Sequence, residues 1–299
     1  MSNCEKGSQL WMQMYANNKN LFDELNFNSF ITSSFETTTT DFDNKFILKQ
    51  EDLIWLSPLK LFDYKEFELK ETDFWMLINT INLLNSTFQI VFPFNRNDIS
   101  KCWAGRGTSP VWDGIALSAD RKTLYLFEAK ANIDEITSGD KVIPKSVQSV
   151  IYRKYNELKD KLEFSIDYTT FLTTSKCHYQ ILNRLWFFDM IRYYIKHYGT
   201  DSSIENVQLV FLEFCNDNTH MPTGKADFHN AYFGISGIWN GFNRISKTTK
   251  KSRPSGLELP NEDISVIYLD VDDISKEYLK INPKFHIPTK NKIIQTKFW

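Results

Sequence analysis

Outside the predicted turn at 118–123, three charged residues interrupt a largely apolar stretch of the chain, residues 109–132. Asp113 lies near its start, and Glu128 and Lys130 lie near its end. Two carboxylates close together in an apolar setting need a compensating cation. Lys130 supplies one positive charge, and Mg2+ or Mn2+, which prefer oxygen ligands, would supply two more. Such an ion can activate water and stabilise charge on a phosphodiester, so these residues are the first candidates for chemistry.

The stretch is predicted to form a β-hairpin whose register gathers the three charges at its open end. If the turn is centred between Asp120 and Arg121, Asp113 faces Glu128 across the hairpin. Alternate residues of a strand share a face. The first predicted face holds Asp113, Ile115, Leu117, Leu124, Leu126, Glu128 and Lys130, and the second holds Trp112, Gly114, Ala116, Tyr125, Phe127 and Ala129. Both faces are apolar along the body of the hairpin, so we expect both to be covered.

A structural interpretation of the same charges stays open. The pattern Glu-x-Lys also occurs at Glu68–Lys70 and Glu157–Lys159, so it carries little information alone. Only the copy at 128–130 lies in an apolar strand paired with an aspartate. The alternative is an ion pair at the end of a sheet with no catalytic role.

The elements that must position the hairpin alternate between helices and strands. A helix is predicted from Thr72, with Phe74, Leu77, Ile78, Ile81 and Leu84 on one face. Further helices are expected at 144–164, 177–199 and 225–242, and strands at 88–94, 207–215 and 264–271. Residues 1–70 show no clear long helix, and their aromatic residues indicate a segment that wraps onto the core. The order predicts an α/β (α+β) fold with a central mixed sheet flanked by helices.

No linker rich in glycine, proline or serine divides the chain, which predicts one elaborated domain over residues 1–299. Within it we expect an N-terminal wrap (1–70), a core (71–215) and a C-terminal helix and strand extension (216–299).

Pro110-Val-Trp-Asp113 and Glu128-Ala-Lys130 together resemble the signature of the PD-(D/E)xK nuclease superfamily, although two residues separate Pro110 from Asp113. The resemblance covers about residues 71–215 and implies a restriction-endonuclease-like core. It implies that Asp113, Glu128 and the backbone carbonyl of Ala129 bind Mg2+ or Mn2+, and that Lys130 completes the catalytic set. The implied activity is that of a metal-dependent phosphodiesterase, a DNA nuclease.

A longer string, WAGRGTSPVWDGIALS with LYLFEAKA and HYQILNRL, also resembles a family of uncharacterised bacterial proteins of about this length. This second resemblance supports the fold and names no substrate.

The superfamily resemblance also suggests auxiliary residues. It implies a further acid on the helix before the hairpin, for which Glu71 and Asp73 are the candidates, with ordinary helix N-terminal charge as the alternative. Some branches carry Gln-x-x-x-Tyr on the following helix, and Gln148 and Tyr152 match that spacing. The alternative is that Gln148 is a solvated glutamine on the helix surface, because this spacing also arises by chance.

Basic residues supply the candidate contacts to nucleic acid. Arg106, between two glycines just before the hairpin, could reach a phosphate or pair with a hairpin carboxylate. The segment 243–256 contains five cations and no acid, and it is a candidate phosphate-tracking loop or a solvated loop. Its cations are Arg244, Lys247, Lys250, Lys251 and Arg253.

Composition limits the remaining choices. The 299-residue chain is 42% hydrophobic with a formal net charge of −2, so a nucleic-acid partner, which the resemblance implies to be DNA, requires a local basic surface. The four cysteines form no Cys-x-x-Cys pair, which predicts free thiols in a reducing compartment. No apolar signal region or membrane-length apolar stretch is found, so we expect a cytoplasmic protein without a membrane partner. A homodimer and an inactive binding or scaffold protein with the nuclease fold both stay open.

Overall fold

The computed structural model describes the chain in separate segments, residues 7–17, 53–59, 63–84, 89–102, 110–136, 152–153, 156, 180, 183–184, 187–188, 190–219, 222–228 and 264–281. Within them lies a five-stranded mixed sheet with the order β1-β4-β5-β6-β7. Strands β1, β4 and β5 pair antiparallel with one another in that order, and β5, β6 and β7 run parallel. The strands are β1 (Leu53–Ser57), β4 (Gly114–Ser118), β5 (Thr123–Lys130), β6 (Asn206–Cys215) and β7 (Ile264–Asp270).

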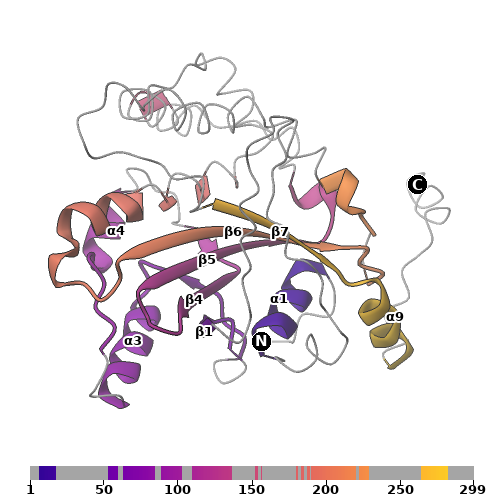
Figure 1. The fold of residues 1–299 in the computed structure, drawn as a ribbon, viewed down its shortest axis with the longest axis horizontal. Helices are drawn as coiled ribbons and strands as arrows, with labels where there is room; N and C mark the ends of the chain where they lie inside the picture. Colours follow the sequence, from indigo (N-terminus) through magenta and orange to yellow (C-terminus); the bar gives the residue numbers. More distant parts are fainter. Residues whose placement is uncertain are drawn as a thin grey trace, which may run out of the picture.

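Two short strands form a second ladder, in which β2 (Phe67–Glu68) pairs antiparallel with β3 (Val111–Trp112). Figure 1 shows the central sheet with α3 (Thr72–Leu84) and α4 (Arg96–Cys102) toward one end of β6 and α9 (Asp272–Ile281) beyond the end of β7. The predicted mixed sheet flanked by helices is thereby confirmed. The central sheet draws strands from all three segments into which we divided the chain.

Each face of the sheet buries its own apolar cluster. One face packs Leu126 and Phe211 against Phe74 of α3 and against Phe187 and Ile191. The opposite face packs against α1 (Gly7–Asn17), whose buried side chains are Leu10, Trp11, Met12, Tyr15 and Ala16. This double coverage explains why β5 and β6 are nearly continuous apolar runs.

Gly114 is required by the close packing of α1 on the hairpin. A Cβ atom there would lie 2.4 Å from the Met12 Cε atom and 3.1 Å from the Trp55 ring. A side chain at this position would displace the end of the Met12 side chain and crowd the Trp55 ring, so glycine allows α1 to pack closely on the hairpin.

The hairpin has the predicted register over its paired length. Ile115 pairs with Leu126 and Leu117 with Leu124. The prediction for Trp112 was wrong, because Trp112 packs in the same cluster as Ile115 rather than on the opposite face. The reason is a break at Asp113, where β3 leaves the central sheet to pair with β2, so the alternation of faces does not continue through this residue.

Three further predictions needed correction. Residues 89–94 are not a strand, because Ile90 exchanges its backbone hydrogen bonds with the side chain of Asn82 rather than with a neighbouring strand. The N-terminal segment contains the helix α1, which sequence periodicity did not reveal. Leu84 is 84% exposed and does not join the buried face of α3.

Other predicted elements are observed in part. Helical residues lie between 180 and 198 and within 152–156, followed by a short 3-10 helix at Gly199–Asp201. A second 3-10 helix, Ile133–Glu135, follows β5. The helix predicted at 225–242 is described only over 225–228, and α9 was not predicted.

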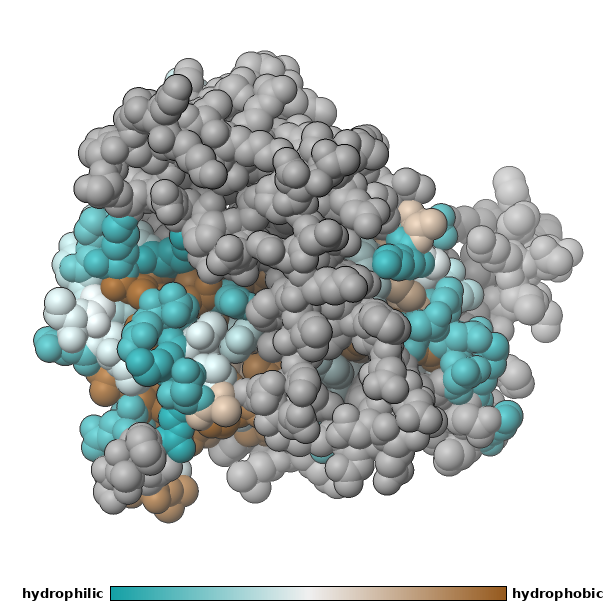
Figure 2. Space-filling model, in the orientation of Figure 1, coloured by the Kyte–Doolittle hydropathy of each residue, from teal (hydrophilic) through white to brown (hydrophobic). Residues whose placement is uncertain are grey.

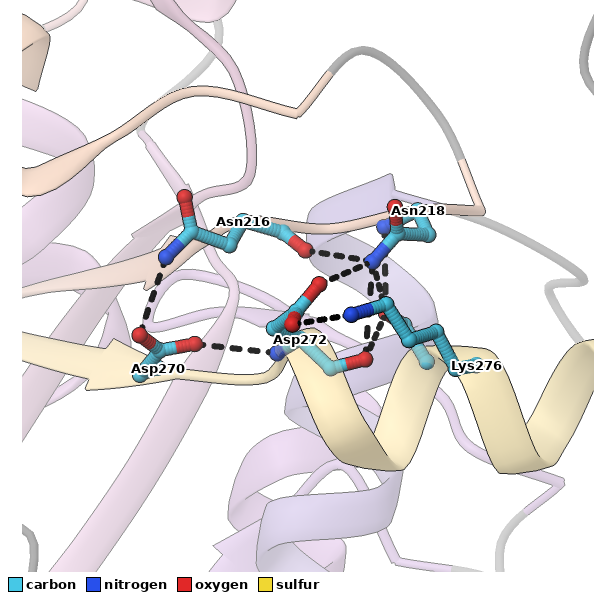
Figure 3. A network of polar contacts seen from close by, with 6 residues as sticks. Asn216, Asn218, Asp270, Asp272 and Lys276 are labelled. Atoms are coloured by element: carbon cyan, nitrogen blue, oxygen red, sulfur yellow. Dashed lines mark hydrogen bonds and ion pairs between the residues drawn. The ribbon is translucent and has the colours of Figure 1, made fainter.

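A polar network ties the end of β6 to the end of β7 and the start of α9 (Figure 3). The Asn218 Nδ2 atom lies within 2.7–3.4 Å of four oxygens, which belong to Asn216, Asp272 and Ser275. Asp270 accepts hydrogen bonds from the Asn216 side chain and from the backbone N–H of Asp272. The network fixes the first turn of α9 against the loop that follows β6.

On the face shown in Figure 2, hydrophilic and hydrophobic side chains alternate over the described surface. Among the described residues, none of the helices combines the length and apolar character needed to cross a membrane.

Candidate functional site

Asp113 occupies the break between β3 and β4, at the end of two ladders. One position before it, Trp112 pairs with Phe67 of β2, and one position after it, Gly114 pairs with Phe127 of β5. Continuing the two registers by one residue brings Asp113 opposite Glu66 on one side and Glu128 on the other. The Asp113 Oδ2 atom accepts a hydrogen bond of 2.7 Å from the backbone N–H of Ala129.

That hydrogen bond also orients Ala129. In an antiparallel ladder the N–H and C=O groups of one residue point toward the same neighbouring strand. The Ala129 carbonyl therefore points to the same side of β5 as Asp113. This agrees with its expected role beside Asp113 as a metal ligand.

Glu128 is more deeply buried than Lys130 and Arg184, with 1% of its surface exposed. Its Oε1 atom lies 2.5 Å from the Lys130 Nζ atom, and its Oε2 atom lies 2.5 Å from the Arg184 Nε atom. Both carboxylate oxygens therefore accept a charge-assisted hydrogen bond. By contrast, the Glu68–Lys70 copy of the pattern forms an ion pair of 3.0 Å whose side chains are 11% and 31% exposed.

Arg184, one of the described helical residues between 180 and 198, contacts the hairpin. Besides Glu128, its guanidinium donates a hydrogen bond of 2.9 Å to the Val111 carbonyl and lies over the Trp112 ring, 5.3 Å from the centroid. Three contacts with three residues make it a fixed, nearly buried cation. From the sequence, Arg184 is a polar residue on a largely apolar predicted helix, which could line a pocket or satisfy hydrogen bonds in the core.

Glu66 completes the group, and the sequence analysis missed it. Its carboxyl interacts electrostatically with Asp113, Glu128 and Arg184 and accepts a hydrogen bond from the Gln9 side chain. One local signal is present in the sequence, the alternation of charged and apolar residues from Glu66 to Lys70. It could not place Glu66 beside the hairpin, because the ladder between β2 and β3 is a long-range pairing.

The carboxyls of Glu66 and Asp113 resist ionisation. Burial raises the pKa of Glu66 to about 8, and repulsion by Asp113 and Glu128 adds to the effect. Burial likewise raises the pKa of Asp113 to about 7, with repulsion by Glu128 the next cause. Both effects disfavour the charged form.

For Glu128 and Lys130, which form an ion pair with each other, the surroundings favour the charged form. Burial acts to raise the pKa of Glu128, but attraction by Arg184 and Lys130 outweighs it, and the pKa is lowered. For Lys130, burial opposes the charge, yet Glu128 and Asp113 raise the pKa above its ordinary value. Lys130 is therefore a protonated donor at neutral pH and not a base.

The charge balance of this cluster, defined as Glu66, Asp113, Glu128, Lys130 and Arg184, determines what it can bind. Fully ionised, three carboxylates and two cations leave one excess negative charge. A divalent cation would reverse that to one positive charge. The donor chemistry, hard carboxylate oxygens on three segments, fits Mg2+ or Mn2+. The present positions do not form a ligand set, because no three acidic, histidine or cysteine side chains in the described part of the chain lie within joint reach of a metal.

The structure thus brings together Asp113, Glu128 and Lys130, as predicted from the hairpin. Glu71 instead pairs with Lys65 at 3.1 Å, and Asp73 pairs with the same ammonium at 2.5 Å. Tyr152 is helical and 51% exposed. The other predicted contacts lie outside the described residues: Gln148, Arg106, Arg244, Lys247, Lys250, Lys251 and Arg253.

In comparisons with known proteins, no family model matches the chain, and no curated protein or solved structure matches it significantly. The class of protein must therefore be argued from the geometry of the cluster.

Proposed function

We propose that the protein is a metal-dependent phosphodiesterase of the PD-(D/E)xK type with a restriction-endonuclease-like core, and that DNA is its substrate. The observation that carries the proposal is the cluster at the hairpin opening, where the partly buried Glu66 and Asp113 lie near the buried ion pairs of Glu128 with Lys130 and Arg184. The pKa values of two of the carboxyls are raised, first by burial and then by repulsion from neighbouring carboxylates. Perturbed groups of this kind concentrate at functional sites.

Asp113, Glu128, Glu66 and the Ala129 carbonyl would hold Mg2+ or Mn2+, and the ion would supply Lewis acidity and positive charge. In the hydrolysis, a water oxygen bonds to phosphorus, one ester P–O bond breaks, and the hydrogen of the water ends on the leaving oxygen. Lys130 remains protonated and donates to the negative charge that develops on the phosphate. With the ion bound, the cluster carries one net positive charge, which matches a singly charged phosphodiester.

The test is a cleavage assay on circular and linear DNA with Mg2+ or Mn2+, using the full chain. Glu128→Gln and Lys130→Met are expected to abolish cleavage, whereas Asp272→Asn, in the polar network at α9, retains it. Cleavage that survives both cluster substitutions would refute the proposal. An RNA substrate in parallel decides which nucleic acid is preferred.

A second function is favoured by one observation, the engagement of both Glu128 oxygens by Lys130 and Arg184. In this alternative the protein keeps the fold as a binding or scaffold protein, and the cluster is a static ion network. It predicts that Glu128→Gln lowers the melting temperature and that Mn2+ leaves the melting temperature of the wild type unchanged.

A further inference from the structure

Arg184 creates a conflict with metal binding at Glu128. The carboxylate has two oxygens, and the described contacts assign one to Lys130 and the other to Arg184, each at 2.5 Å. A cation of charge +2 beside either oxygen would be repelled by the protonated nitrogen already bound there, although each carboxylate oxygen offers a second lone pair. Withdrawal of one of the two partners would therefore favour metal binding at Glu128.

Lys130 is poorly placed to be that partner. It stands two residues from Glu128 on the same face of β5, so the strand itself holds the two side chains together. Its pKa is raised by Glu128 and by Asp113, the two hairpin carboxylates. Movement away from Glu128 would leave its buried charge with less compensation.

Arg184 is better placed to withdraw. It comes from a different element, so its distance from Glu128 can change without distortion of β5. Two further contacts, the Val111 carbonyl and the Trp112 ring, would keep the guanidinium seated after it releases the carboxylate. The guanidinium has five N–H donors, of which the described contacts use two.

We infer that Arg184 is an intramolecular counter-ion that occupies the Glu128 carboxylate in the metal-free protein and is displaced when the metal binds. This inference rests on the proposed metal site and adds its regulation. Arg184 neutralises Glu128 and keeps the metal-free protein folded, and its displacement weakens metal binding. Removal of the guanidinium should therefore have two opposite effects, lower stability without metal and tighter binding of metal.

The experiment measures the Kd of Mn2+ by electron paramagnetic resonance for the wild type, Arg184→Met and Arg184→Lys, with thermal unfolding of each protein with and without Mn2+. Arg192→Met is the matched control, because Arg192 lies in the same helical segment over the ring of Phe188, 5.6 Å from the centroid. We expect Arg184→Met to lower the Mn2+ Kd about tenfold and to increase the rise in melting temperature that Mn2+ produces. Arg184→Lys, which keeps the charge, and Arg192→Met should stay near the wild type.

Arg184→Met with an unchanged or weaker Mn2+ affinity would overturn the inference while leaving the metal site intact, provided the wild type binds Mn2+ through Glu128. If neither the wild type nor any variant binds Mn2+, the proposed function fails and the inference fails with it. Arg184→Met that folds only in the presence of Mn2+ supports the inference, because a structural role alone would not link folding to the metal.

Discussion

Two acid-rich regions lie near the ends of strands in this protein, and they differ in how their charges are compensated. In the network at the start of α9, Asp272 is bound by Lys276 and Asn218, and these hydrogen bonds lower its pKa. In the cluster at the hairpin opening, burial and mutual repulsion raise the pKa of Glu66 and Asp113. Clustered carboxylates are therefore not evidence of a binding site by themselves. What distinguishes the hairpin cluster is that burial and mutual repulsion oppose the ionisation of two of its carboxyls.

The largest difference between the two regions should come from removing their lysines. Lys130→Met leaves Glu128, which is 1% exposed, with less compensation, and we expect it to lower the free energy of unfolding by about 3–5 kcal/mol. Lys276→Met removes an exposed i,i+4 pair, which solvent screens, and should change the free energy of unfolding far less. Urea unfolding without metal measures both values. Equal losses for the two variants would mean that the buried charges of the cluster are compensated by other groups.

Substitution of one aspartate in each region should change stability in opposite directions. Asp113→Asn keeps an acceptor for the Ala129 N–H but removes a charge that the site disfavours, so it should raise the free energy of unfolding at pH 8 by about 1–2 kcal/mol without metal. Asp272→Asn loses the attraction to Lys276 and should be destabilising at the same pH. Denaturation curves at pH 8 give both signs, and destabilisation by Asp113→Asn would contradict the charge balance.

The pH dependence of stability offers a smaller but independent test. Carboxyls with raised pKa values bind protons more tightly in the folded than in the unfolded state, so they stabilise the fold at acidic pH, and this contribution is lost as pH rises through about 7 to 8. Without metal, unfolding in urea should become easier between pH 5 and pH 8. Glu66→Gln should flatten that slope, because one of the two groups no longer titrates. The same slope in the variant would show that other groups control it.

The Asp272 region should respond at a different pH. The pKa of Asp272 is lowered, so its contribution is present above the pKa of the unfolded chain and is lost only as pH falls below it. Asp272→Asn should therefore leave the slope between pH 5 and pH 8 unchanged, which makes it the control for Glu66→Gln.

The sequence predicted the parts of the site that depend on local register. The turn between Asp120 and Arg121 and the alternation along both strands were sufficient to bring Asp113, Glu128 and Lys130 to one end of the hairpin. The strand predicted at 88–94 was wrong because an apolar run alone does not determine backbone pairing. The side chain of Asn82 forms the hydrogen bonds with the backbone of Ile90 that a neighbouring strand would have formed.

Glu66 and Arg184 could not be predicted in this way, because their positions depend on contacts between distant segments. Glu66 reaches the cluster only because β2 pairs with β3, and Arg184 only because the described helical residues near it, Phe187, Phe188 and Ile191, pack on one face of the sheet. The break at Asp113 has the same origin, since β3 changes its partner there. Local patterns thus located the chemistry, and the tertiary fold supplied its electrostatic surroundings.

The central claim is that the hairpin cluster, and not the network at α9, binds a divalent cation. The most direct measurement is an Mn2+ titration followed by electron paramagnetic resonance, with the full-length wild type, Glu128→Gln and Asp272→Asn. We predict one ion bound by the wild type and by Asp272→Asn, and loss of that ion in Glu128→Gln. Absence of binding by the wild type, or equal binding by the wild type and Glu128→Gln, would contradict the account.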